Sequence, residues 1–111
     1  MQSAKKRGYR VERKVRLLLE KHGWKTLRAG ASLGEADIIC VKAGKCMLLQ
    51  VKSTKKKKLY YYEYMRPELE GFPFFIVVDF GYGKVRVLPP QKQAIESDGT
   101  DLKEFLIKFK P

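Results

Sequence analysis

The stretch that decides the fold is "GEADIICVKAGKCMLLQVKS", residues 34–53. It holds two strand-like apolar runs, 35–42 and 45–53, with Ala43 and Gly44 between them. A two-residue turn between apolar runs is typical of an antiparallel β-hairpin. The stretch therefore predicts a hairpin whose tip is Ala43-Gly44.

The hairpin brings polar side chains from both runs together. Counting back from the tip places Asp37 opposite Gln50 and Glu35 opposite Lys52, and facing side chains in a hairpin are in contact distance. Because side chains alternate along a strand, Gln50 and Lys52 share one face. The pattern predicts a small patch of acids, an amide and an amine. The alternative is an edge salt bridge between Glu35 and Lys52, with Asp37 capping a turn.

The same register separates the two cysteines, Cys40 and Cys46. They are too few for a cysteine-only metal site and lack the CxxC spacing. Cys40 would oppose Met47 and Cys46 would oppose Val41, so the two thiols point to opposite faces of the hairpin. We expect reduced thiols and no intramolecular disulfide.

The rest of the chain predicts one α/β domain spanning residues 1–111. A helix is expected over 4–22, where apolar residues recur at helical spacing and Gly23 follows as a terminator. Residues 72–80 are typical of a central strand. Further strands are expected at 24–29 and 84–88, and helical segments at 62–70, 90–97 and 101–109. The expected architecture is a mixed sheet with helices on its sides.

The charge of the chain points to a polyanionic partner. Twenty-four Lys and Arg stand against twelve Asp and Glu, a formal net charge of +12. Nucleic acid is the commonest partner of such a surface, and an anionic membrane surface or solubility alone are the alternatives. No apolar run is long enough for a transmembrane helix. The first residues contain no apolar signal segment, so we expect an intracellular, cytoplasmic protein.

Hard oxygen ligands gather around the hairpin patch. Glu12 lies one residue beside the apolar stripe of the first helix, at the border of the face that packs on the sheet. Glu12, Asp37 and the amide oxygen of Gln50 are ligands that Mg²⁺ or Mn²⁺ prefers. Lys52 is adjacent, where an amine can orient an attacking water or stabilise charge on a phosphate.

At this point the residues resemble a known family. Asp37 followed by Gln50-Val51-Lys52 resembles the PD-(D/E)xK nuclease core, with Ala36 where the family name has proline. "KRGYRVERKVRLLLEKHGW" and "LRAGASLGEADII" resemble more narrowly the archaeal-type Holliday junction resolvases, over residues 5–60. The resemblance implies a restriction-endonuclease-like core with a mixed five-stranded sheet flanked by helices. It also implies a homodimer that cuts opposed strands of a four-way DNA junction at Mg²⁺-dependent sites.

The resemblance also assigns roles to individual residues. Glu12, Asp37 and Gln50 would be metal ligands together with the main-chain carbonyl of Val51, and Lys52 would be catalytic. Ser32 would lie in a loop near the scissile phosphate. Gln50 departs from the family, because resolvases normally carry Glu there, although related restriction-type nucleases use Gln-x-Lys. Nothing in the sequence explains the amide.

Basic and aromatic residues are expected to hold the DNA. Positive side chains crowd the start of the first helix and follow the Gln-Val-Lys strand directly, where phosphate contacts would make binding salt-dependent. The expected DNA-binding residues are Lys5, Lys6, Arg7, Arg10, Arg13, Arg28, Lys55, Lys56, Lys57, Lys58 and Tyr60. Two alternatives remain open: a restriction- or repair-type endonuclease acting on linear duplex, and a non-catalytic DNA-binding dimer.

Overall fold

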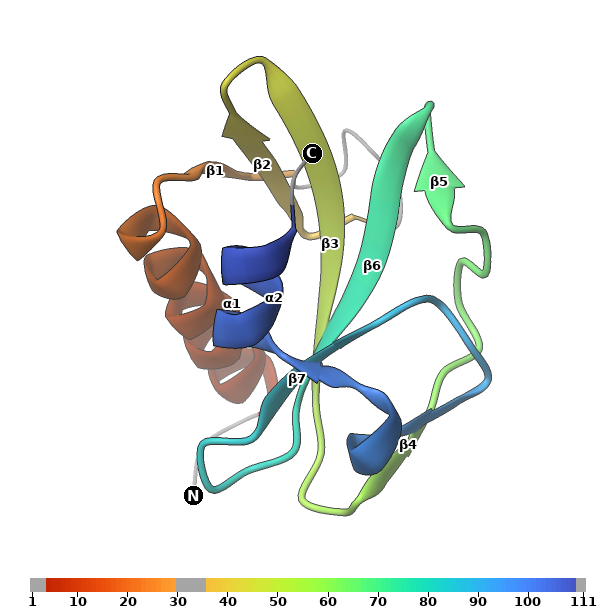
Figure 1. Cartoon of the computed structure of the whole chain (residues 1–111). Coiled ribbons are helices and arrows are strands. Elements are labelled where there is room, and N and C mark those ends of the chain that lie inside the picture. The colour runs from red at the N-terminus through yellow and green to blue at the C-terminus, as the bar shows by residue number, and fades with distance from the viewer. Residues whose placement is uncertain (1–3, 30–35, 110–111) are drawn as a thin grey trace.

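A mixed β-sheet forms the centre of the protein. The computed structural model describes residues 4–29 and 36–109. Seven of its strands form one sheet in the order β1-β2-β3-β6-β7-β9, with β5 paired to β6 at the side (Figure 1). The elements are α1 (Ala4–Lys21), β1 (Lys25–Arg28), β2 (Ile38–Lys42), β3 (Lys45–Ser53), β4 (Lys58–Tyr60), β5 (Glu68–Leu69), β6 (Phe72–Asp79), β7 (Val85–Leu88), β8 (Gln93–Ile95), β9 (Thr100–Asp101) and α2 (Leu102–Lys108).

The hairpin of β2 and β3 has the register that the sequence predicts. Lys42 pairs with Lys45 and Ile38 pairs with Leu49. Ala43 and Gly44 both have positive φ, 51° and 78°, which is the conformation of the hairpin turns whose twist matches that of the strands. On its other side β3 pairs in parallel with β6, so β3 lies inside a mixed sheet.

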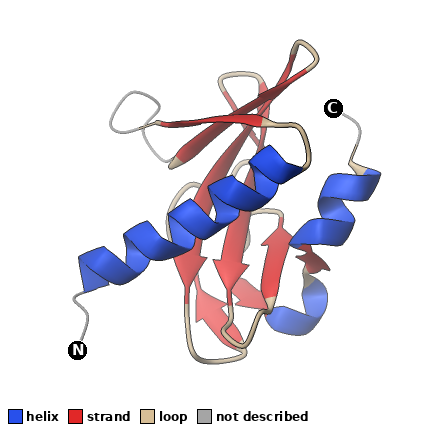
Figure 2. Cartoon of the chain, turned by 90° about the vertical axis from the view of Figure 1, so that its left-hand side faces the viewer, coloured by secondary structure: helices blue, strands red, loops and turns tan. Residues whose placement is uncertain are grey.

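Two different layers cover the two faces of the sheet. Both helices pack on one face (Figure 2), where buried side chains of α1 and α2 join those of β2, β3, β6 and β7 in one core cluster. The opposite face is covered by Tyr61, Tyr64 and the two-stranded ribbon of β4 and β8. The fold class is therefore confirmed, but the helices lie on one face rather than on both. Among the described residues, no helix is long and apolar enough to span a bilayer.

Several local expectations are wrong. The sheet has seven strands rather than five because β5 and β9, of two residues each, extend it. Residues 62–70 form an irregular connection ending in β5 instead of a helix, since Tyr61 and Tyr64 turn inward to cover the sheet. Residues 90–97 contain β8, which pairs with β4, so tertiary pairing overrides a weak helical pattern.

The two cysteines offer a test of this packing. Cys40 is buried in the core under the helices, and burial raises the pKa of its thiol to about 12. Cys46 is only partly buried on the opposite face, and burial raises the pKa of its thiol as well. Both are free, as predicted. A thiol reagent near neutral pH is expected to modify Cys46 and spare Cys40 in the native protein, because only the accessible thiol can form the reactive thiolate.

The measurement is a thiol titration followed by peptide mapping, with the denatured protein as the control that exposes both thiols. Rapid native modification of Cys40 would show that the helical layer does not seal this face of the sheet.

Candidate active site

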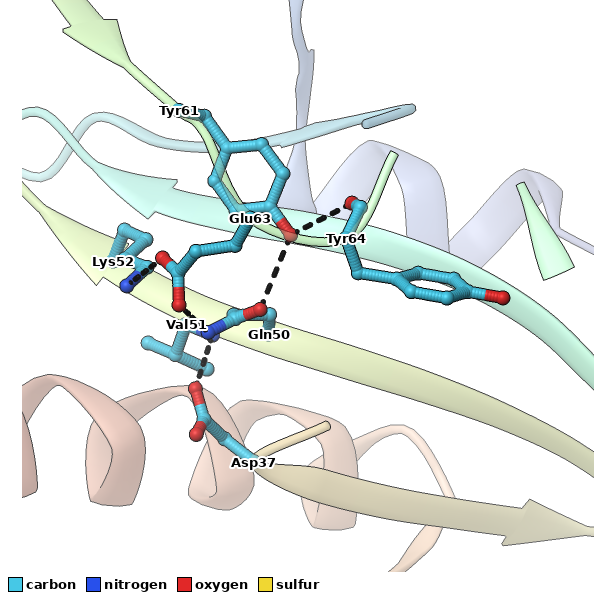
Figure 3. Close-up of polar contacts among 7 residues, drawn as sticks. All are labelled: Asp37, Gln50, Val51, Lys52, Tyr61, Glu63 and Tyr64. Atoms are coloured by element: carbon cyan, nitrogen blue, oxygen red, sulfur yellow. Dashed lines mark hydrogen bonds and ion pairs between the residues drawn. The ribbon is translucent and has the colours of Figure 1, made fainter. Parts of the chain in front are cut away.

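Asp37 lies where β2 begins and is fixed to the main chain of β3. Its backbone N–H donates to the carbonyl of Leu49 at 2.8 Å, and its Oδ2 accepts from the N–H of Val51 at 2.8 Å (Figure 3). Burial raises the pKa of Asp37, and the charges of Glu12 and Glu63 raise it further, against the opposing Val51 N–H and Lys52. The hairpin thus holds a partly desolvated carboxylate against the Gln-Val-Lys segment.

Gln50 is 6% exposed and is the one buried polar residue in the described part of the chain. Its Nε2 donates to Oε1 of Glu63 at 3.1 Å, and its Oε1 accepts from the hydroxyl of Tyr61 at 3.1 Å. The strand can bury an amide because both of its ends are hydrogen-bonded. The sequence predicts that the amide oxygen faces a metal, whereas here it faces Tyr61. Its role as a ligand stays a prediction.

Lys52 points to the same side of β3 and forms an ion pair with Oε2 of Glu63. Glu63 therefore contacts both polar side chains of the strand, one with each carboxylate oxygen (Figure 3). Glu63 is not among the site residues predicted from the sequence. Its only signal is a lone acid in the tyrosine-rich segment "LYYYEY", and no fixed spacing relates an irregular connection to a strand.

Glu12 reaches the site from α1 but is paired. Its Oε1 accepts from Nε of Arg28 at 2.6 Å, and its side chain is 14% exposed. The hydrogen bond to Glu12 raises the pKa of Arg28, whose guanidinium also lies 5.2 Å from the ring centre of Tyr9. The structure brings Glu12 close enough to Asp37 to influence its pKa, with Arg28 as a neutralising partner.

The donor set suits a hard divalent cation. Asp37, Glu12 and Glu63 offer carboxylate oxygens, which Mg²⁺ and Mn²⁺ favour over nitrogen and sulfur. Within residues 4–29 and 36–109, however, no three His, Cys, Asp or Glu side chains gather closely enough to make a metal site by themselves. A cation here would need main-chain or amide oxygens, water or substrate as further ligands.

The expected DNA-binding residues lie at several places. Arg10 and Lys55 line one cavity beside the end of β3, so the two basic segments do meet there. Lys56, Lys57 and Lys58 are exposed. Arg13 is exposed on α1, while Lys5, Lys6 and Arg7 lie in its first turns with side chains that the structure does not describe. Ser32 and Glu35 fall within 30–35, outside the described residues.

Tyr60 belongs to an exposed aromatic pair. Its ring stacks on that of Tyr62 with centroids 6.4 Å apart and an interplanar angle of 4°. The ammonium of Lys58 lies 5.7 Å from the Tyr60 ring centre. A flat exposed ring beside a cation suits contact with bases and phosphates.

A mixed sheet flanked by helices, with Asp37 beside Gln50-Val51-Lys52, is consistent with the restriction-endonuclease-like α/β fold class. The family model described as archaeal Holliday junction resolvase (Hjc) matches residues 3–105, so the chain belongs to that family. The resemblance drawn from the sequence is thereby confirmed. The protein is a Holliday junction resolvase, which is a structure-specific endonuclease.

Solved structures that share the fold include the following two. One is the Holliday junction resolvase Hjc from Archaeoglobus fulgidus, with 22% identity and a TM-score of 0.72, covering 95% of this chain and 99% of that one. The other is the bacterial homing endonuclease I-Ssp6803I, with 18% identity and a TM-score of 0.59, covering 99% of this chain and 72% of that one. No curated protein sequence matches the chain.

The hydrogen bond that orients Gln50 can be tested by Tyr61→Phe. This change leaves the buried amide oxygen without the Tyr61 donor. An unsatisfied buried polar atom costs about 1–3 kcal/mol, so we expect the free energy of unfolding in urea to fall by that amount. Tyr60→Phe is the control, because its side chain is exposed and the change should stay within about 0.5 kcal/mol. Equal losses in the two variants would contradict the role of Tyr61.

Proposed function

We propose that this resolvase cleaves DNA with the help of a divalent cation, Mg²⁺ or in its place Mn²⁺, held at Asp37. The observation that carries the proposal is the position of Asp37, whose carboxylate is bonded to the main chain of the Gln-Val-Lys segment. The carbonyl of Val51 and the carboxylate of Glu12 are the neighbouring oxygens predicted to share the ion. The amide oxygen of Gln50, also predicted as a ligand, faces Tyr61 in this structure. A bound cation of this kind polarises phosphate oxygens and lowers the pKa of water.

Lys52 is the proposed catalytic residue. It follows Val51 on the same strand, and its side chain is held by Glu63 at the surface rather than buried in the core. An ammonium next to the scissile phosphate stabilises the negative charge that develops when water attacks. Ser32 remains a predicted neighbour of that phosphate.

The metal requirement is tested by removing and restoring the ion. Chelation with EDTA should stop cleavage of a four-way junction, and excess Mg²⁺ should restore it. Binding of the junction should survive chelation, because phosphate contacts and not the ion supply most of the affinity. Cleavage that continues in EDTA would show that Asp37 does not act through a metal.

The basic surface predicts a specific salt dependence. Each phosphate contact by a lysine contributes roughly one unit to the slope of log affinity against log salt concentration. Replacing Lys55, Lys56, Lys57 and Lys58 together by alanine should therefore weaken junction binding and reduce the slope by up to about four units.

The matched control replaces exposed lysines elsewhere, Lys45 at the hairpin tip and Lys108 at the end of α2. An unchanged slope in the quadruple variant, measured by fluorescence anisotropy in EDTA, would contradict a phosphate-binding role for this segment.

We also propose that the protein acts as a homodimer. Cutting two opposed strands of one junction requires two sites related by a two-fold axis, and a symmetric dimer provides them. Sedimentation at micromolar concentration should give the mass of two chains, and a monomer there would contradict the proposal.

A further inference from the structure

Position 50 on β3 carries an amide and not a carboxylate. We propose that Glu63 is a metal ligand and that Gln50 is the residue that positions its carboxylate. The inference rests on the proposed metal-dependent function. Glu63 comes from the connection between β4 and β5, outside the segments that carry the nuclease motif.

The direction of the Gln50 amide is the first argument. A carboxylate without a proton can only accept a hydrogen bond, so the group of Gln50 that faces Glu63 must be its NH2. An NH2 has no lone pair to offer a cation. The amide oxygen is turned toward the hydroxyl of Tyr61 in the core. Gln50 therefore presents an N–H donor to the site. The carboxylate of Glu63, which accepts from that donor, is the proposed oxygen ligand.

The charge of the site is the second argument. Glu12 forms an ion pair with Arg28. The positive charge of Lys52 acts to lower the pKa of Asp37. Those four residues bring two negative and two positive charges, which is a poor environment for a divalent cation. Glu63 adds a carboxylate beside Gln50 and Lys52. Because no three such side chains gather among the described residues, Glu63 would share the ion with Asp37, and main-chain oxygens or water would complete the ligand set. With Glu63 the site becomes net negative, as a hard cation requires.

The connection that carries Glu63 is built to hold it. The hydroxyl of Tyr61 lies within hydrogen-bond distance of both Gln50 and the carbonyl of Tyr64, at 3.1 and 2.9 Å. These contacts tie the residues on either side of Glu63 to β3 and to each other (Figure 3). The side chain of Glu63 itself is 40% exposed, so its carboxylate is anchored at one side and open to solvent at the other.

The same geometry accounts for glutamine at position 50. A glutamate there would replace the N–H that Glu63 accepts with a second negative charge, and like charges at this distance repel. Gln50 and Glu63 are thus a complementary donor and acceptor pair that carries a single negative charge. Exchanging the two side chains would keep both the hydrogen bond and the total charge.

The experiment measures Mn²⁺ binding by calorimetry on the full chain without DNA. The variants are Glu63→Gln, the exchange Gln50→Glu with Glu63→Gln, and Asp37→Asn. The control is Glu68→Gln, which removes one exposed carboxylate at the start of β5. Melting temperatures and circular dichroism establish that each variant is folded.

We expect Glu63→Gln to weaken Mn²⁺ binding about 10–100-fold, the range seen when groups around a metal site are removed. The exchange should restore most of the affinity, and Glu68→Gln should match the wild type. Wild-type affinity in Glu63→Gln, together with loss of binding in Asp37→Asn, would overturn the role of Glu63 and leave the metal site at Asp37. An exchange variant as weak as Glu63→Gln would overturn the pairing with Gln50. If the wild type binds no Mn²⁺, the proposed metal-dependent function itself fails.

Discussion

Asp37→Asn is expected to lower the rate of junction cleavage by more than about a hundredfold. Removing a group that only hydrogen-bonds to a metal ligand already costs about 10–100-fold, and Asp37 is proposed to be a ligand itself. The asparagine can still accept from the N–H of Val51, so the local geometry is kept while the charge is lost. Junction affinity should not change, because the basic surface is untouched. Single-turnover cleavage and anisotropy on the same preparations separate the two quantities. Asp98→Asn, at the exposed end of the short 3-10 helix Glu96–Asp98, is the control.

The same substitution should raise the stability of the metal-free protein. Burial raises the pKa of Asp37 in the folded state above its unfolded value, so the ionised carboxylate costs stability at neutral pH. That cost disappears as pH falls through the folded pKa, because the protonated form then prevails in the fold. At neutral pH, Asp37→Asn should therefore have a higher melting temperature than the wild type. Its free energy of unfolding should be higher by less than about 1 kcal/mol, because the group is partly exposed. The difference should vanish in acid.

A lower melting temperature for Asp37→Asn at neutral pH would mean that the carboxylate stabilises the folded protein. Higher stability together with lost cleavage is the pattern of a side chain kept for chemistry at some cost to stability.

Lys52→Ala is expected to reduce cleavage about 10²–10³-fold, the usual effect of removing one group that stabilises developing charge in a transition state. Substrate binding should be retained. Stability should fall by about 1 kcal/mol or less, because the ion pair with Glu63 is partly exposed. Glu63 keeps its hydrogen bond to Gln50 in this variant, so metal binding should persist.

Lys84→Ala is the matched control, because Lys84 forms a comparable half-exposed ion pair with Glu96 far along the chain. Both alanine variants should lose similar stability, and only Lys52→Ala should lose activity. Equal cleavage rates in the two would rule out a catalytic role for Lys52.

The parts of the site that the sequence predicts are those set by local rules. The tip Ala43-Gly44 determines the register of β2 and β3, and that register places Asp37 beside the Gln-Val-Lys segment. Helical spacing likewise places Glu12 at the edge of α1. These relations depend on turn geometry and side-chain period, which can be counted along a chain.

The parts that were missed depend on contacts between distant segments. Glu63 sits on an irregular connection whose position follows from Tyr61 packing against the sheet, and no period or spacing encodes that contact. The pairing of Glu12 with Arg28 depends in the same way on how α1 lies against β1. Single-sequence patterns indicate which residues share a strand face, but not which side chain from an irregular segment will reach it.

The most direct test maps the cuts made in each strand of a four-way junction, beside a linear duplex of the same arm sequence, with Mg²⁺ or with EDTA. We expect paired cuts in two opposed strands of the junction in Mg²⁺, an intact duplex, and no cuts in EDTA. Equal cleavage of the duplex, or cuts that persist in EDTA, would contradict a metal-dependent junction resolvase built around Asp37.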